Sequence, residues 1–127
     1  MTTRRIVQIR RIYDDPTPQD GTRVLVDRLW PRGVSKTRAR LDEWCKQVAP
    51  STELRTWYGH DPKLFDEFAR RYRDELTARD RAAALTHLHQ LADRSTLTLL
   101  TGTKNTDISE AAVLADLLAH PNRSPDR

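Results

Sequence analysis

A short, almost unbroken apolar run near the N-terminus decides the class of fold. The segment 22–30 contains Val24–Val26 in succession, and Pro31 ends it because proline cannot donate a hydrogen bond to a sheet. A strand without polar alternation is buried on both faces, as in a parallel or mixed sheet covered by helices. A second run of this kind spans 96–101, so the sequence predicts an α/β domain.

The segments around these two strands predict further elements. They are a strand over 4–13, a helix with Leu41, Trp44, Cys45 and Val48 on one face, a turn capped by Ser51, and helices from Asp61-Pro62 to Leu76, over 79–93 and after Asp107. Asp107 and Glu110 have the spacing of a capping box for the last helix. The elements predict a three-layer domain with a small, mostly parallel sheet flanked by helices. It is expected to span 1–120, with a flexible tail over 121–127.

Length and composition exclude several classes of protein. The chain has 127 residues, which fits one domain, and Cys45 is its only cysteine, so no internal disulfide or cysteine metal cluster forms. His87 and His89 are two residues apart and lack the spacing of a helical metal site. No metal and no cofactor are expected. No segment approaches the roughly 18 apolar residues of a membrane span, and no signal core precedes the first strand, so a cytoplasmic protein without membrane contact is expected.

The strongest candidate site lies where the two buried strands end. Ligands of open α/β sheets bind at the carboxyl ends of strands, and here the segments 27–33 and 101–104 occupy those ends. Arg28 and Arg32 suit an anion, because guanidinium groups form paired hydrogen bonds with phosphate or carboxylate. Lys104 could add a charge, and Gly102 would let backbone N–H groups approach the ligand. For Asp27 and Trp30 a structural reading stands beside the functional one: Asp27 pairs with Arg28 or the sheet, and Trp30 belongs to the core.

His60 is the second candidate, in the sequence Trp57-Tyr-Gly-His-Asp-Pro62. It precedes the predicted N-cap Asp61, and the positive end of the helix dipole would favour its neutral form, which suits a general base. The alternative is that His60 only hydrogen-bonds the turn. Cys45 is interpreted as a buried thiol and Ser109 as a helix cap, and neither as a nucleophile.

Several of these motifs, in order, resemble the YeaO-like branch of the domain-of-unknown-function 488 family. They are Val24–Gly33, Leu41–Trp44, Ala49–Leu54 and Trp57–Pro62, with Phe68 and Tyr72. The resemblance covers roughly 6–118, and it implies no established activity. Where family members tend to have an aromatic residue after the last strand and a His-Asn pair before the final helix, this chain has Thr101 and Ile108-Ser109. This departure weakens the case for catalysis more than the case for ligand binding.

These observations lead to one functional hypothesis and two alternatives. The first is an anion site formed by Arg28, Arg32, His60 and Lys104 for a phosphate-bearing metabolite or nucleotide. In an enzyme, His60 would act as acid or base and Asp27 would orient an arginine. The second is a non-catalytic nucleic-acid-binding protein that uses Arg4, Arg5, Arg10, Arg11 and 70–73, because the net charge is +4. The third is a dimeric module with an interface near Trp44 or Trp57. The oligomeric state does not follow from the sequence.

Overall fold

A small parallel sheet forms the centre of the domain. The computed structural model describes residues 6–120; 1–5 and 121–127, which include the predicted tail and the start of the predicted first strand, lie outside this range. Four strands pair in the order β1-β4-β2-β3, all of them parallel. They are β1 (Val7–Arg11), β2 (Thr22–Leu25), β3 (Glu43–Trp44) and β4 (Leu97–Thr101). The expected class, an α/β domain with a parallel sheet, is confirmed.

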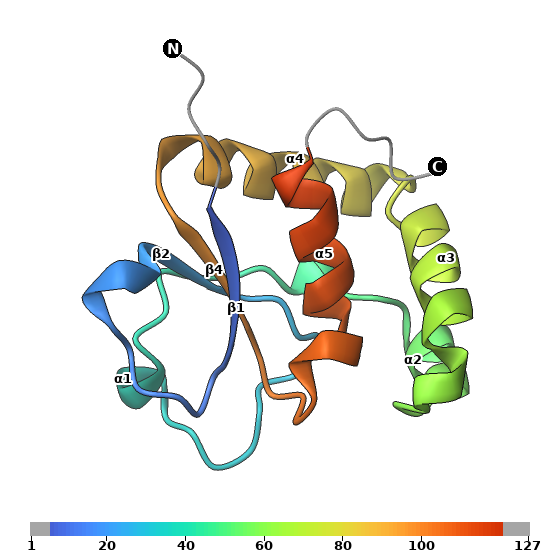
Figure 1. Ribbon diagram of the computed structural model, residues 1–127, viewed down its shortest axis with the longest axis horizontal. Coiled ribbons are helices and arrows are strands. Elements are labelled where there is room, and N and C mark those ends of the chain that lie inside the picture. The colour runs from blue at the N-terminus through green and yellow to red at the C-terminus, as the bar shows by residue number, and fades with distance from the viewer. Residues whose placement is uncertain (1–5, 121–127) are drawn as a thin grey trace.

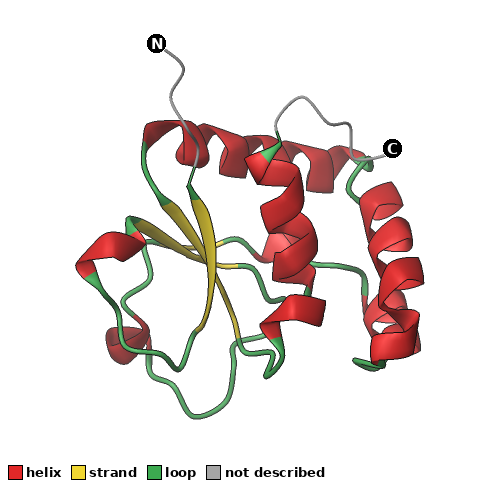
Figure 2. Ribbon diagram, viewed as in Figure 1, coloured by secondary structure: helices red, strands yellow, loops and turns green. Residues whose placement is uncertain are grey.

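Two outer layers of unequal thickness cover this sheet. One contains α2 (Thr52–Tyr58), α3 (Phe65–Glu75), α4 (Arg79–Arg94) and α5 (Glu110–Ala119), and the other contains the short α1 (Lys36–Ala39) with the neighbouring loops. Figure 1 shows α2, α3 and α5 on one side of the sheet and α1 on the other, with α4 across the top of the view. In Figure 2 the helices on the thin side are visibly short. The expected three-layer arrangement is therefore confirmed.

Alternation along the strands assigns side chains to the two faces of the sheet. Val24, Leu97 and Leu99 are fully buried against the helices of the thick layer. On the opposite face, Leu25 and Leu100 lie side by side in the register and pack under α1 in a separate apolar cluster. The two central strands thus contribute apolar side chains to both faces, as the unbroken apolar runs predicted.

The amino ends of β2 and β4 are joined by a buried polar network. The Arg23 guanidinium donates to the Asp20 carboxylate and to the carbonyl oxygens of Ala39 and Arg40, while the Thr98 hydroxyl donates to the Asp20 carbonyl oxygen. Burial alone would raise the pKa of Asp20, but the hydrogen bonds from Thr17 and Arg23 outweigh it and lower that pKa. Both charges of the pair are satisfied, so this network serves the fold.

The start of β2 also requires a residue without a side chain. Gly21 has a φ of 63°, and a Cβ atom there would lie 2.2 Å from the backbone oxygen of Thr96. The N–H group of Thr22 donates to that same oxygen, over 2.9 Å. Gly21 therefore permits the close approach that brings β2 beside β4.

The prediction of a helix with Leu41, Trp44, Cys45 and Val48 on one face is wrong. The segment instead forms the short strand β3 followed by a 3-10 turn, Lys46–Val48. The N–H groups of Asp42 and Cys45 donate to backbone oxygens of β2, at Arg23 and Leu25. Pairing with a distant strand outweighs the local helical periodicity. The interpretation of Cys45 as a buried thiol is confirmed, since burial and the charge of Glu43 raise its pKa to about 11.

Two predicted helix starts also need revision, and two caps are confirmed. Asp61 caps a short 3-10 turn, Pro62–Leu64, and α3 begins only at Phe65. The last helix is capped by Ser109, whose Oγ accepts from the N–H group of Ala112, so the proposed Asp107–Glu110 capping box is wrong. Ser51 caps α2 as predicted. Among residues 6–120, no helix combines the length and apolar character that a membrane crossing requires.

Candidate functional site

A cleft of about 640 Å³ opens at the carboxyl ends of β2 and β4. The loop after β2 forms one wall, the loop after β4 and the start of α5 form the floor, and α2 with the turn after it forms the opposite wall. Its lining includes Tyr13, Asp27, Arg28, Leu29, Trp30, Pro31, Arg32, Arg55, Thr56, Tyr58, His60, Gly102, Thr103 and Glu110. The volume lies within the range of about 300–1,000 Å³ that is usual for small-molecule sites.

Most residues predicted for the site meet in this cleft. Asp27, Arg28, Trp30, Arg32, His60 and Gly102 all line it, although they come from three separate segments of the chain. Lys104 is an exposed residue of the loop after β4 and does not belong to the lining. The rule that ligands bind at strand carboxyl ends therefore located the cleft.

Two tryptophans hold the loop after β2 in place. The Trp44 indole donates to the carbonyl oxygen of Asp27 over 2.7 Å, and the Trp30 indole donates to that of Val34 over 2.7 Å. The two rings also pack edge to face, with centroids 5.4 Å apart. Trp30 thus has the structural role that the sequence left open. The loop is anchored near both ends, and its tip, Arg28 and Leu29, is exposed.

The Asp27 carboxylate is fixed by groups at the end of β4. The Thr101 hydroxyl donates to one oxygen over 2.8 Å, and the N–H group of Gly102 donates to the other over 2.7 Å. A Cβ atom at Gly102 would lie 3.0 Å from the Cβ of Pro31, so this approach also needs glycine. The N–H group of Gly102 therefore positions Asp27. The role proposed for Gly102 from the sequence, an approach of backbone N–H groups to a ligand, stays a prediction. Within residues 6–120, Asp27 forms no ion pair with an arginine.

Glu110, in the first turn of α5, places a second carboxyl group beside Asp27. The Thr101 hydroxyl lies 3.4 Å from its Oε1. Burial, a hydrogen bond with Asp27 and the negative charge of Asp27 raise the pKa of Glu110 well above its ordinary value, and only the charge of Arg55 and a backbone hydrogen bond oppose this. The hydrogen bond and the charge of Asp27 therefore favour the neutral form of the Glu110 carboxyl group.

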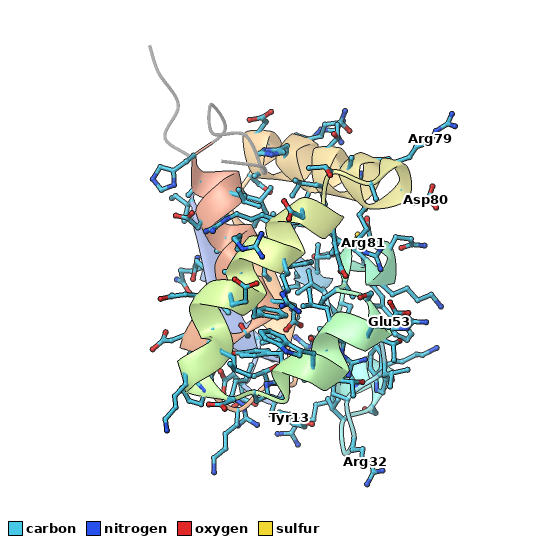
Figure 3. The ribbon with its side chains drawn as sticks, turned by 90° about the vertical axis from the view of Figure 1, so that its right-hand side faces the viewer. Tyr13, Arg32, Glu53, Arg79, Asp80 and Arg81 are labelled. Atoms are coloured by element: carbon cyan, nitrogen blue, oxygen red, sulfur yellow. The ribbon has the colours of Figure 1, made fainter. Side chains whose placement is uncertain are left out.

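Three arginines line the same cleft as the two carboxyl groups. Arg28 and Arg32 belong to the loop after β2 and Arg55 to α2, and all three are exposed. Within the described range 6–120, Arg28 and Arg32 form no ion pair and no side-chain hydrogen bond. Figure 3 shows Arg32 pointing away from the body of the domain, with Tyr13 nearby; the Tyr13 hydroxyl donates to the carbonyl oxygen of Arg32 over 2.8 Å. The cleft therefore has unpaired cations at its mouth.

His60 lies on the wall opposite these loops. Its backbone φ of 57° is in the left-handed region, directly after Gly59 with a φ of 55°. Its ring packs at 5.8 Å from the ring of Tyr58, whose hydroxyl donates to the carbonyl oxygen of Ile108 over 2.7 Å. His60 is exposed, and the turn that Asp61 caps, Pro62–Leu64, has three residues.

Sequence reasoning missed Glu110 and Arg55. Glu110 was assigned to a cap, but it lies three, four and seven residues before Val113, Leu114 and Leu117, which are all buried. An acidic residue on the core-facing stripe of a helix is a signal that its carboxyl group is buried, and this signal was available from the sequence. For Arg55 there was no comparable signal, because charged residues on short helices are usually solvated.

The arginines of the alternative nucleic-acid surface are mostly engaged with other groups. Arg70 and Arg71 both pair with Glu67, and together they lower its pKa to about 2. Arg73 lies 3.7 Å from Asp116. Arg10 lies 3.9 Å from Asp20, while Arg4 and Arg5 lie outside the described residues. Arg71 also covers the ring of Trp57, at 4.2 Å from its centroid.

The cleft combines hydrogen-bond acceptors at its floor with cations at its mouth. Among the described residues, no group of three or more His, Cys, Asp or Glu side chains could hold a metal ion. Fold and cleft together define a small parallel α/β protein with an open, arginine-lined cleft at the carboxyl ends of its central strands.

Comparison with known proteins gives the family. A family model described as the inactive DUF488-N3 subclade matches residues 6–126, and the chain belongs to this family. It is 53% identical to the uncharacterised protein Rv3073c of Mycobacterium tuberculosis over 112 residues, which are 88% of this chain and 92% of that protein. It is 43% identical to the uncharacterised protein YeaO of Escherichia coli over 112 residues, 88% of this chain and 96% of YeaO. No solved structure matches.

The expected family membership is thus confirmed. Thr101, where the resemblance implied an aromatic residue, donates to Asp27. Where it implied a His-Asn pair, the Ile108 backbone oxygen accepts from Tyr58 and Ser109 caps α5. Neither side chain at 108–109 supplies an imidazole or an amide to the cleft.

Proposed function

We propose that this protein is a cytoplasmic binding protein for a small phosphate-bearing metabolite or nucleotide, which it binds in the cleft without converting it. The observation that carries the proposal is the group of arginines without carboxylate partners, Arg28 and Arg32, at the mouth of a cleft at strand carboxyl ends. Guanidinium groups match phosphate oxygens with two parallel hydrogen bonds, so an anion satisfies donors that the fold leaves unused.

The state of the carboxyl pair is compatible with an anionic ligand. Two ionised carboxylates at the floor would repel a phosphate group, but the raised pKa of Glu110 favours its neutral form and so reduces this repulsion. Arg28, Arg32 and Arg55 outnumber the two carboxyl groups. The cleft therefore attracts anions, and the effect weakens as salt screens it.

The proposal that the ligand is bound but not converted rests on the groups nearest the floor of the cleft. Asp27 is already engaged with Thr101 and Gly102, and His60 is exposed on the far wall, where its side chain forms no hydrogen bond within residues 6–120 that would orient it as a base. The family model that matches this chain carries the description inactive. Each of these observations favours binding over catalysis.

The test is a binding measurement with matched variants. Wild type, Arg28→Gln, Arg55→Gln and Arg94→Gln are titrated by calorimetry and melted with sugar phosphates and nucleotides. Arg94 lies at the end of α4 just before β4 begins, far from the cleft along β4, and serves as the control for lost charge. A ligand at about 100 times its Kd adds roughly 2.7 kcal/mol to stability in wild type and in Arg94→Gln. Equal ligand effects in all four proteins, or none in wild type, contradict the proposal.

A further inference from the structure

A second groove of about 500 Å³ adjoins the cleft. Its lining is Arg28, Leu29, Lys46, Gln47, Ala49, Asp80 and Arg81. Arg28 and Leu29 line both spaces, so the exposed tip of the loop after β2 is their common wall. Leu29 is 65% exposed there. A ligand in the cleft that extends past this tip enters the second groove.

The second groove has three cations and one carboxylate. Lys46 lies with its Nζ 4.9 Å from the ring centroid of Trp44, the residue that anchors the loop. Arg81 donates from Nε to the carbonyl oxygen of Ala49 over 3.0 Å, which fixes the guanidinium against the 3-10 turn after β3. Figure 3 shows Arg81 on the inner side of the first turn of α4, while Arg79 points away from the domain. Within residues 6–120, neither Lys46 nor Arg81 forms an ion pair.

The floor of the cleft suits a different part of the same ligand. An ionised carboxylate has about four acceptor positions, and Thr101, Gly102 and Glu110 occupy three of those on Asp27. The remaining position on Asp27 can receive an N–H donor from a ligand. Tyr13 and Trp30 also line the cleft and give it an aromatic part that a planar ring can contact.

We propose that the cleft and the second groove bind one nucleotide with at least two phosphate groups: the base contacts the floor beside Asp27, Arg28 contacts the first phosphate group, and Lys46 and Arg81 contact the second. This inference rests on the proposed function and specifies its ligand. Simple phosphate would use only the mouth of the cleft, and a sugar phosphate would leave the second groove empty.

The experiment is calorimetric titration with adenosine and guanosine that carry no, one or two phosphate groups. The diphosphate is expected to bind about ten-fold more tightly than the monophosphate, which is the effect of one added charge-assisted contact. Lys46→Gln and Arg81→Gln should lose this ten-fold gain and keep the affinity for the monophosphate. Arg79→Gln removes a cation from the same turn of α4 and should keep the gain. Arg81→Lys, which retains the charge, covers the case in which Arg81→Gln folds poorly.

The possible results separate the two proposals. If wild type binds mono- and diphosphates equally, or if Lys46→Gln and Arg81→Gln keep the ten-fold gain, the two-groove ligand is wrong and the proposed anion cleft stands. If sugar phosphates bind and no nucleotide does, the two-groove ligand is again wrong and the proposed anion cleft again stands. If only a short single-stranded RNA binds, with affinity that falls steeply with salt, both proposals are wrong.

Discussion

The same two strands, β2 and β4, carry a charged cluster at each end, and the two clusters differ in how they are paired. At the amino ends, Arg23 and Asp20 bind each other and are almost completely buried, with backbone oxygens taking the remaining donors. At the carboxyl ends, two carboxyl groups lie side by side, and Arg28 and Arg32 in the same cleft form no ion pair within residues 6–120. The amino-end cluster satisfies its own charges, whereas the cluster in the cleft does not.

The largest effect is expected at the amino ends. Arg23→Met leaves the buried Asp20 without its hydrogen-bonded guanidinium and with Arg10 at 3.9 Å as its nearby cation. Breaking a buried pair in this way costs about 3–5 kcal/mol in the free energy of unfolding. Urea denaturation measures the loss. Arg38→Met, which changes a side chain that is 67% exposed, should stay within about 0.5 kcal/mol of wild type. If Arg23→Met lowers the free energy of unfolding by less than about 1 kcal/mol, the network does not stabilise the fold.

The pH dependence of this cluster has a defined sign. The pKa of Asp20 is lowered from 3.8 in the folded protein, so its ionised form contributes stability above that pH. The contribution disappears as the pH falls through the lowered pKa. Arg23→Met removes one cause of the lowering, so its stability should decline less steeply on the acid side than that of wild type.

At the carboxyl ends, the pH dependence of stability is expected to have the opposite sign, and Glu110→Gln tests this. The folded protein holds the Glu110 proton above the ordinary pKa of 4.5, so wild type binds more protons folded than unfolded and loses stability as the pH rises from 4.5 to the raised pKa. The amide cannot ionise, so the variant should be more stable than wild type at neutral pH and equal to it near pH 4. Urea denaturation across this pH range measures the difference. Asp107→Asn, at an exposed site before α5, is the control.

The smallest change in stability is expected for Arg28→Gln. Its side chain is exposed and makes no ion pair within residues 6–120, so the free energy of unfolding should change by less than about 0.5 kcal/mol. Thermal melting without ligand measures this directly. A loss of several kcal/mol would place Arg28 with Arg23 among the residues that serve folding, and the contrast between the two ends would disappear.

The sequence predicted the fold where the signal was local. The apolar runs of β2 and β4 and the cap at Ser51 were recognised because each depends on neighbouring residues. The segment 41–48 was assigned to a helix because its apolar residues have helical spacing, and nothing local reveals that Asp42 and Cys45 bond to a strand about 20 residues earlier. β3 exists only through that partner.

The candidate site was predicted in position but not in composition. The strand ends indicated Arg28 and Arg32, and the structure brings them to one cleft. The neighbouring carboxyl group of Glu110 comes from a helix more than 80 residues later, and the sequence does not give the distance between two such groups. Asp27 was expected to orient an arginine, but its partners are a hydroxyl, an N–H group and a carboxyl group from the far end of the chain.

The order of the strands has a consequence for how the protein is made. β4 comes last along the chain but lies between β1 and β2, which do not pair with each other. A nascent chain that has reached only α4 therefore has no central strand, and its two earliest strands have unpaired edges. Such long-range parallel pairing slows folding and exposes these edges to other chains. The ligand cleft, whose floor is the loop after β4, forms only once this last strand has been inserted.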